Sequence, residues 1–211
     1  MKYKGIIFDL DGVICFTDKY HYLAWKRLAD KLGIYFDETI NNRLRGVSRM
    51  ESLEIILEKS TKKYSKEEKE DFAEQKNKMY VELLEDMTPA DLPKEVKTTL
   101  DDLRKQGVLL AIGSSSKNAK RILKHLGLEN YFDAISDGTN ITKSKPDPEV
   151  FLKAAEYLQL EPQECLVVED AVAGIKAATA GGFDSAGLGE ASECEMTTYQ
   201  LSGFAELRNI N

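Results

Sequence analysis

The feature that most constrains this sequence is a short apolar run that ends in two aspartates, GIIFDLDGVI at residues 5–14. Residues 5–8 have the composition of a strand that is buried on both faces of a parallel sheet. Asp9 and Asp11 follow in a tight loop at the carboxyl end of that strand, where open α/β sheets bind ligands. Two carboxylates this close repel each other unless a divalent cation lies between them, and Mg²⁺ prefers oxygen ligands. The sequence therefore predicts a magnesium site that serves phosphate chemistry.

Composition excludes several classes of function. The chain has 211 residues and a formal net charge of -7, so a surface that binds nucleic acid is not expected. Its three cysteines, Cys15, Cys165 and Cys194, form no CxxC pair, which argues against a disulfide framework or a zinc site. No apolar run approaches the roughly 20 residues of a membrane span, and the amino terminus lacks a signal-peptide pattern. We expect a cytoplasmic monomer whose partners are small molecules.

Two breaks divide the chain into an α/β core and a helical insert. The first is the loop at residues 13–18, and the second is residues 87–93, where two prolines exclude a helix interior. Apolar residues recur at helical spacing between the breaks, with no strand signal. We therefore predict an all-helical cap domain at 18–88, inserted into a core of residues 1–17 and 89–211.

The core pattern alternates helices and strands, which predicts a Rossmann-like parallel sheet with right-handed crossovers. A helix is expected from Pro148 to Leu160, with Asp147 as its N-cap. The tail after Gly189 shows no clear apolar strand, and we expect a strand or loop there, followed by a short helix. The predicted strands are residues 5–8, 108–112, 134–135 and 165–168.

Each predicted strand is followed by residues suited to phosphate chemistry. Taken singly, each group has an ordinary structural interpretation as a capped loop or a helix start. In a parallel sheet, however, all four groups would lie at one edge. In chain order the groups are Asp9 with Asp11, then Ser114, Ser115 and Ser116, then Lys145, and finally Glu169 with Asp170.

The chemistry of phosphoryl transfer assigns a role to each group. Asp9 is the expected nucleophile and would form an aspartyl phosphate. Asp11 would protonate the leaving oxygen and later accept a proton from the attacking hydroxyl, while its backbone carbonyl reaches the metal. Glu169 and Asp170 would complete the magnesium ligands that Asp9 and Asp11 begin.

The remaining groups would stabilise the transferring phosphoryl group. Lys145 would balance its charge, and Ser114 would hold its oxygens together with the amides of the following turn.

The sequence resembles the haloacid dehalogenase-like phosphotransferases, and the resemblance spans nearly the whole chain. It rests on FDLDGV at 8–13, on the serine after the second strand, on SKPDP at 144–148 and on ED at 169–170. The insert resembles the cap of the β-phosphoglucomutase family within that group. The residues that carry this second resemblance are Thr17, YHYLAWK at 20–26, GVSR at 46–49, QKNKMY at 75–80 and SSSKN at 114–118.

The resemblance implies further site residues. The phosphate that is not transferred would be bound by Arg49 from the cap, with Ser115, Ser116, Lys117 and Asn118 from the core. His21 and Lys76 would position the general acid-base group, and Thr17 would belong to the hinge. The residues implied to line the sugar pocket are Trp25, Gly46, Val47, Ser48 and Ser52.

Without the resemblance, the cap residues also have structural interpretations. His21 could be a solvated residue at a helix start, Trp25 could belong to the apolar core, and Lys76 could face water. One position departs from the family pattern, because Phe16 stands where many relatives have an aspartate. A hinge contact made by that carboxylate would be absent or replaced.

The reaction implied is interconversion of β-D-glucose 1-phosphate and D-glucose 6-phosphate through β-D-glucose 1,6-bisphosphate. The same aspartyl phosphate could instead be attacked by water, which would make the protein a sugar-phosphate phosphatase. A phosphosugar sensor without turnover is a third alternative, although such a sensor has no chemical need for the nucleophile.

Overall fold

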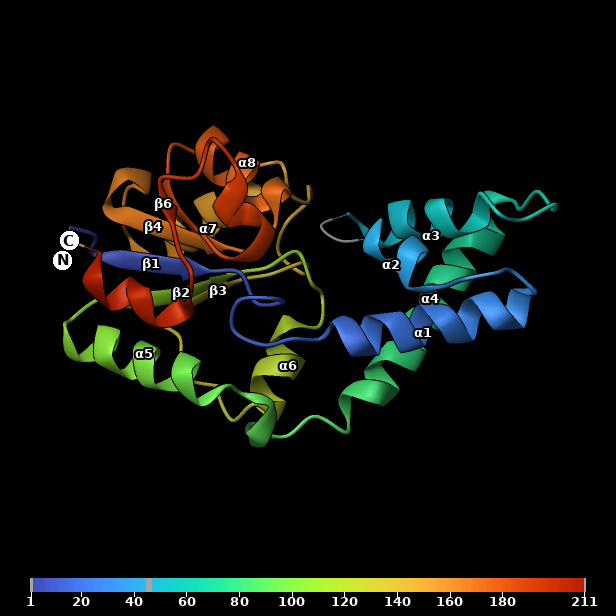
Figure 1. Cartoon of the computed structure of the whole chain (residues 1–211), viewed down its shortest axis with the longest axis horizontal. Helices are drawn as coiled ribbons and strands as arrows, with labels where there is room; N and C mark the ends of the chain where they lie inside the picture. Colours follow the sequence, from blue (N-terminus) through green and yellow to red (C-terminus); the bar gives the residue numbers. More distant parts are fainter. Residues whose placement is uncertain (1, 45–46, 211) are drawn as a thin grey trace. The chain divides into compact units, whose positions relative to one another are not determined.

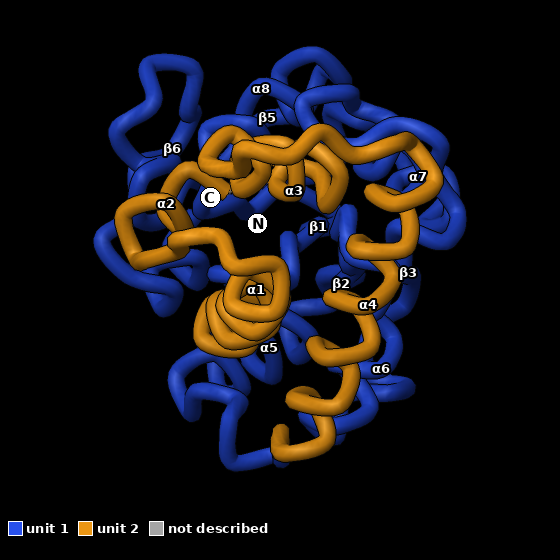
Figure 2. Tube along the Cα trace, turned by 90° about the vertical axis from the view of Figure 1, so that its right-hand side faces the viewer, with its two compact units in different colours: residues 1–16, 88–211 blue, residues 17–87 orange. Residues whose placement is uncertain are grey.

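The computed structural model of the chain describes residues 2–44 and 47–210. The chain forms two compact units, one of Met1–Phe16 with Thr88–Asn211 and the other of Thr17–Met87. Figure 2 colours the first unit blue and the second orange. These limits lie one residue from those expected for the core and the cap. Among the described residues, no helix has the length and apolar character needed to cross a bilayer.

The first unit is built on a parallel six-stranded sheet in the order β3-β2-β1-β4-β5-β6 (Figure 1). The two central strands, β1 and β4, are buried along their whole length, as expected for strands covered on both faces. The strands are β1 (Gly5–Phe8), β2 (Leu109–Gly113), β3 (Ala134–Ser136), β4 (Cys165–Glu169), β5 (Asp184–Gly187) and β6 (Tyr199–Gln200).

Helices cover both faces of this sheet. In Figure 1, α5 lies on one side of β1, and α7 and α8 lie on the other. Ile7, Val167 and Phe151 belong to one core cluster, so this core joins the centre of the sheet to α7. The α-helices are α5 (Lys94–Lys105), α6 (Ala119–His125), α7 (Glu149–Leu158) and α8 (Val172–Ala180). The 3₁₀ helices are η1 (Pro89–Asp91), η2 (Pro162–Glu164), η3 (Gly189–Glu193) and η4 (Phe204–Asn209).

In the second unit, every regular element of the described residues is a helix. Gly33 ends α1 with a φ of 69°, a left-handed conformation that glycine adopts without steric cost. Ser48 and Ser65 begin α3 and α4 with capping boxes. Leu28, Leu53 and Ile56 are buried in a core of this unit. The helices are α1 (Asp18–Leu32), α2 (Glu38–Asn42), α3 (Arg49–Leu57) and α4 (Lys66–Leu84).

The structure corrects two details of the sequence analysis. Pro148, not Asp147, is the N-cap of α7, which ends at Leu158; Asp147 still accepts a hydrogen bond from the Glu149 amide at 3.1 Å. A fifth strand, β5, was not predicted, because DSAG contains no apolar run even though Ser185 and Ala186 are buried. The tail contains the two-residue strand β6 and ends in the 3₁₀ helix η4.

Candidate active site

The pairing of β1 with β4 brings three predicted acidic residues together. Phe8 is in register with Val168, and the Asp9 amide donates to the Val168 carbonyl at 2.9 Å. The chain therefore leaves both strands at the same edge of the sheet, with Asp9 beside Glu169 and Asp170. One carboxylate oxygen from each of these acids lies within 4.8 Å of the others.

Lys145 pairs with two of these acids. Its Nζ donates to Asp9 Oδ1 at 2.5 Å and to Glu169 Oε1. The side chains of Lys145, Asp9 and Glu169 are only 9%, 11% and 1% exposed, so water screens these ion pairs weakly. Burial alone lowers the pKa of Lys145, but the charges of Asp9 and Glu169 outweigh it and hold the pKa above its ordinary value. Lys145 is therefore a fixed positive charge beside Asp9.

Asp170 and Glu169 have strongly raised pKa values. Burial raises the pKa of Asp170 to about 8, and the charges of Asp9 and Glu169 add to that effect. Burial likewise raises the pKa of Glu169 to about 7, although Lys145 opposes the shift. Glu169 Oε2 also accepts hydrogen bonds from the amides of Asp170 and Ala171, at 3.1 and 3.2 Å. Two buried carboxylates thus share one lysine, with the half-buried Asp170 beside them.

This donor set fits a hard divalent cation. All three candidate ligands, Asp9, Glu169 and Asp170, offer oxygen atoms only, which suits Mg²⁺ rather than a softer metal. A bound cation would favour the charged form of Glu169 and Asp170 and so oppose the burial and the acidic neighbours that raise their pKa values. Asp11, the fourth predicted ligand, is half-buried, and its backbone forms a bridge with Cys15.

The predicted serine cluster lies in the loop between β2 and α6. The Ser114 amide donates to the Ser136 carbonyl at 3.0 Å, so Ser114 lies beside the carboxyl end of β3. Ser114 Oγ accepts from the Ser116 amide at 3.1 Å, and Ser116 Oγ accepts from the Asn118 amide at 3.2 Å. These bonds form a tight turn before α6, with Ser115 half-buried and Lys117 exposed.

Sequence reasoning missed one residue at this edge, Asp137. It follows β3 directly, whereas Lys145 lies further along the same connection. Asp137 is fully buried, and its Oδ1 accepts from the Thr139 amide at 2.8 Å and from the Thr139 hydroxyl at 2.5 Å. The available signal was its position as the first charged side chain after a short strand.

In the second unit, His21 and Lys76 lie together. Lys76 Nζ lies 2.8 Å from His21 Nδ1 and 4.7 Å from the ring centroids of both Trp25 and Tyr80. The His21 ring stacks on Tyr80, with centroids 4.1 Å apart. Lys76 is 3% exposed, so it does not face water. Tyr80 was missed, although its spacing of four residues from Lys76 in QKNKMY places both on one helix face.

These neighbours keep His21 neutral. Burial lowers the pKa of His21 well below its ordinary value, and the positive charges of Lys76 and Arg49 lower it further. Arg49 is the first residue of α3, and its Nη2 donates to Asn77 Oδ1 at 2.9 Å. Asn77 was also missed; it lies next to Lys76 in the same motif.

The other predicted cap residues differ in exposure. Thr17 is 1% exposed and precedes α1, and Trp25 and Ser52 are buried at 3% and 4% exposed. Trp25 belongs to the apolar core of its unit. Val47 is 39% exposed, and Ser48 is the N-cap of α3. Gly46 lies outside the described residues.

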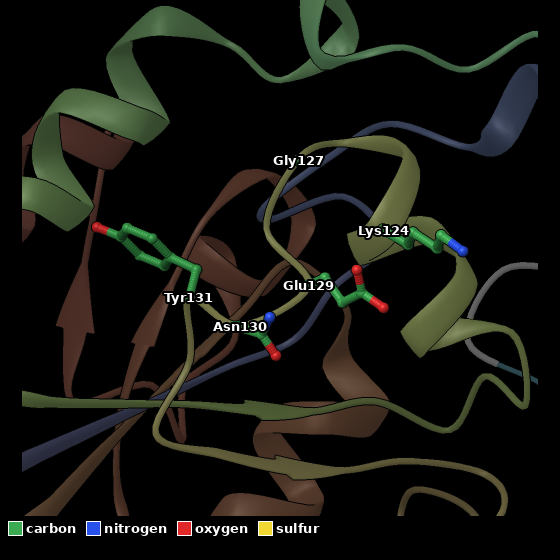
Figure 3. Close-up of a pocket in the computed structure, with 5 residues that line it drawn as sticks. All are labelled: Lys124, Gly127, Glu129, Asn130 and Tyr131. Carbon is green, nitrogen blue, oxygen red and sulfur yellow. The ribbon is translucent and has the colours of Figure 1, made fainter.

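A separate hollow in the first unit does not coincide with the acidic site. In Figure 3, the side chains of Lys124 and Tyr131 point away from each other across it. The hollow lies on the connection from α6 to β3, which reaches the amino end of β3. The acidic site, by contrast, lies at the carboxyl ends of the strands. Its lining residues are Lys124, Gly127, Glu129, Asn130 and Tyr131.

Comparison with known proteins identifies the family. A family model described as haloacid dehalogenase-like hydrolase matches residues 3–182. The chain belongs to this family. The acidic cluster and Lys145 therefore lie in the fold of an enzyme family, as the resemblance implied.

Individual relatives of this haloacid dehalogenase-like chain include a mutase and a phosphatase. A β-phosphoglucomutase of Bacillus subtilis is 43% identical over 189 residues, which cover 89% of this chain and 84% of that protein. A phosphorylated carbohydrates phosphatase of Thermotoga maritima is 32% identical and covers 86% of this chain and 82% of its own length. The crystal structure of a Clostridium difficile β-phosphoglucomutase matches with a TM-score of 0.88 at 41% identity, covering 97% of this chain and 93% of that one.

Proposed function

We propose that this protein is a magnesium-dependent β-phosphoglucomutase, which interconverts β-D-glucose 1-phosphate and D-glucose 6-phosphate. The observation that carries phosphoryl transfer is the contact of Lys145 with Asp9 beside the acidic pair Glu169 and Asp170. The mutase relatives at 43% and 41% identity support the choice of reaction. We also propose that the protein acts on sugar phosphates as a cytoplasmic monomer.

Asp9 performs the covalent chemistry in this proposal. A carboxylate oxygen of Asp9 attacks phosphorus, the bond from phosphorus to the sugar oxygen breaks, and Asp11 donates a proton to the leaving oxygen. Asp11 then accepts the proton of the sugar hydroxyl that attacks the aspartyl phosphate. With β-D-glucose 1-phosphate as the acceptor, the aspartyl phosphate gives its phosphoryl group to O6 and β-D-glucose 1,6-bisphosphate forms. The bisphosphate rebinds in the reverse orientation, and Asp9 then attacks the phosphorus on O1, which leaves D-glucose 6-phosphate and restores the aspartyl phosphate.

Electrostatics and hydrogen bonds support that step. Lys145 contributes a fixed positive charge, and Ser114 with the amides of its turn binds the phosphoryl oxygens. Mg²⁺, held by Asp9, Asp11, Glu169 and Asp170, would neutralise charge on the same oxygens when bound.

The phosphate that is not transferred requires a second binding site. Arg49 suits this role because its guanidinium donates hydrogen bonds to two oxygens at once. We assign Ser115, Ser116, Lys117 and Asn118 to the same phosphate. In the cap, His21 and Lys76 position the acid-base group, and Thr17 belongs to the hinge. The residues that line the sugar pocket are Trp25, Gly46, Val47, Ser48 and Ser52.

A sugar-phosphate phosphatase is the second candidate. The observation that favours it is the identity of 32% and 31% to a phosphorylated carbohydrates phosphatase of Thermotoga maritima and a fructose-1-phosphate phosphatase of Escherichia coli. In a phosphatase, water would attack the aspartyl phosphate in place of the sugar hydroxyl.

A phosphorus NMR time course distinguishes the two reactions. The protein is mixed with β-D-glucose 1-phosphate, Mg²⁺ and a trace of β-D-glucose 1,6-bisphosphate. The proposal predicts glucose 6-phosphate with little inorganic phosphate. Inorganic phosphate as the main product would assign the protein as a phosphatase, and unchanged substrate would favour a binding protein without turnover.

A further inference from the structure

A glycine in the first turn of α8 lies directly against the acidic site. Gly174 is the third residue of that helix. A Cβ atom at Gly174 would lie 1.9 Å from Glu169 Cδ, 2.0 Å from Glu169 Oε1 and 2.5 Å from Glu169 Cγ. Real Cβ contacts are essentially never this short, so any side chain at position 174 would displace the Glu169 carboxylate.

The Glu169 carboxylate has little freedom to yield. It is 1% exposed, and it is fixed by Lys145 on one oxygen and by the amides of Asp170 and Ala171 on the other. A methyl group at position 174 would therefore break these contacts and move a carboxylate of the acidic cluster.

The backbone does not require glycine at this position. Gly174 lies within an α-helix, where alanine is the better helix former. Gly12 differs in this respect: a Cβ there would lie 2.0 Å from Asp170 Oδ2, but its φ of +93° already favours glycine. Among the glycines that the structure describes, only Gly174 allows steric contact with the acidic pair to be separated from backbone strain.

We propose that Gly174 is a positioning residue for the metal site, because its missing side chain leaves the space in which the Glu169 carboxylate is held. This inference deepens the proposed function, since it rests on the assignment of Glu169 as a magnesium ligand. Gly174 contacts neither substrate nor metal in this account and acts only through Glu169.

The test is the magnesium affinity of the full-length Gly174→Ala variant, measured by titration calorimetry. We expect binding weaker by about tenfold or more, as overpacking of this severity implies. Thermal unfolding without Mg²⁺ should give a cooperative transition, which would show that the variant is folded. Gly203→Ala is the matched control, because its φ of −163° suits any residue and its nearest Cβ neighbour, Glu95 Oε1, is 3.6 Å away.

A shortened acid gives a second, independent measurement. Glu169→Asp withdraws the carboxylate from Gly174, so combining it with Gly174→Ala should cost less affinity than the two separate losses predict. Additive losses, or magnesium binding by Gly174→Ala equal to that of the parent, would overturn the inference alone. A parent protein that binds no Mg²⁺ would overturn the metal assignment and the inference with it.

Discussion

Replacing Lys145 by methionine should destabilise the first unit strongly in the absence of metal. Methionine keeps much of the side-chain volume and removes the charge that pairs with Asp9 and Glu169. Loss of one partner from a buried ion pair costs about 3–5 kcal/mol, because the other charge stays buried and unpaired. The contacts of Lys145 have this character, since its side chain is 9% exposed and those of Asp9 and Glu169 are 11% and 1% exposed.

The assay is urea and thermal unfolding of the full chain in metal-free buffer. A chain of this size changes its melting temperature by roughly 2–4 °C per kcal/mol, so we expect a decrease of roughly 6–20 °C. Added Mg²⁺ should recover part of this loss, because the cation would take over the neutralisation of the acids. Activity should fall about 10²- to 10³-fold, the usual effect of removing one group that stabilises charge in the transition state.

A nearby lysine provides the control for this experiment. Lys143 pairs with Asp147 at 3.3 Å, but its side chain is 71% exposed. Lys143→Met should therefore change the free energy of unfolding by less than about 1 kcal/mol. If Lys145→Met and Lys143→Met unfold at the same temperature, then Lys145 is not a buried ion-pair partner and the reasoning is refuted.

Two further predictions concern the second unit. Because the pKa of His21 is lowered in the folded state, the unfolded chain binds a proton first, and stability should fall by up to about 1.4 kcal/mol per pH unit below about pH 6.5. Urea unfolding from pH 7 to 5 should show a shallower fall for His21→Gln; identical profiles would contradict the prediction. Asn77→Ala removes the acceptor that orients Arg49, so KM for the sugar phosphate should rise about 2- to 10-fold with kcat nearly unchanged. An unchanged KM would show that Asn77 does not position Arg49.

The sequence predicted the acidic cluster because its geometry follows from strand pairing. Once an apolar run is identified as a buried parallel strand, the residues after it must lie at the carboxyl edge of the sheet, as Asp9 and Glu169 do. The same reasoning failed for β5, since its residues 185–187 are buried without being an apolar run. A strand of small residues at that position depends on its neighbours rather than on its own pattern.

Side-chain contacts between distant segments could not be predicted in the same way. Lys145 was expected near the phosphoryl group, but its pairing with both Asp9 and Glu169 depends on the path of the loop before α7. The stacking of His21 on Tyr80 likewise depends on how α1 packs against α4. Helical periodicity predicts which face of a helix is buried, not which residue of a second helix lies opposite.

The most direct test of the central claim is to locate the phosphoryl group on the protein. The enzyme is mixed with β-D-glucose 1,6-bisphosphate and Mg²⁺, quenched in acid and digested, and its peptides are analysed by mass spectrometry. The account predicts one added phosphoryl group on Asp9, and none on that peptide in Asp9→Asn. A phosphoryl group on another residue, or a protein that turns over without ever carrying one, would contradict the account.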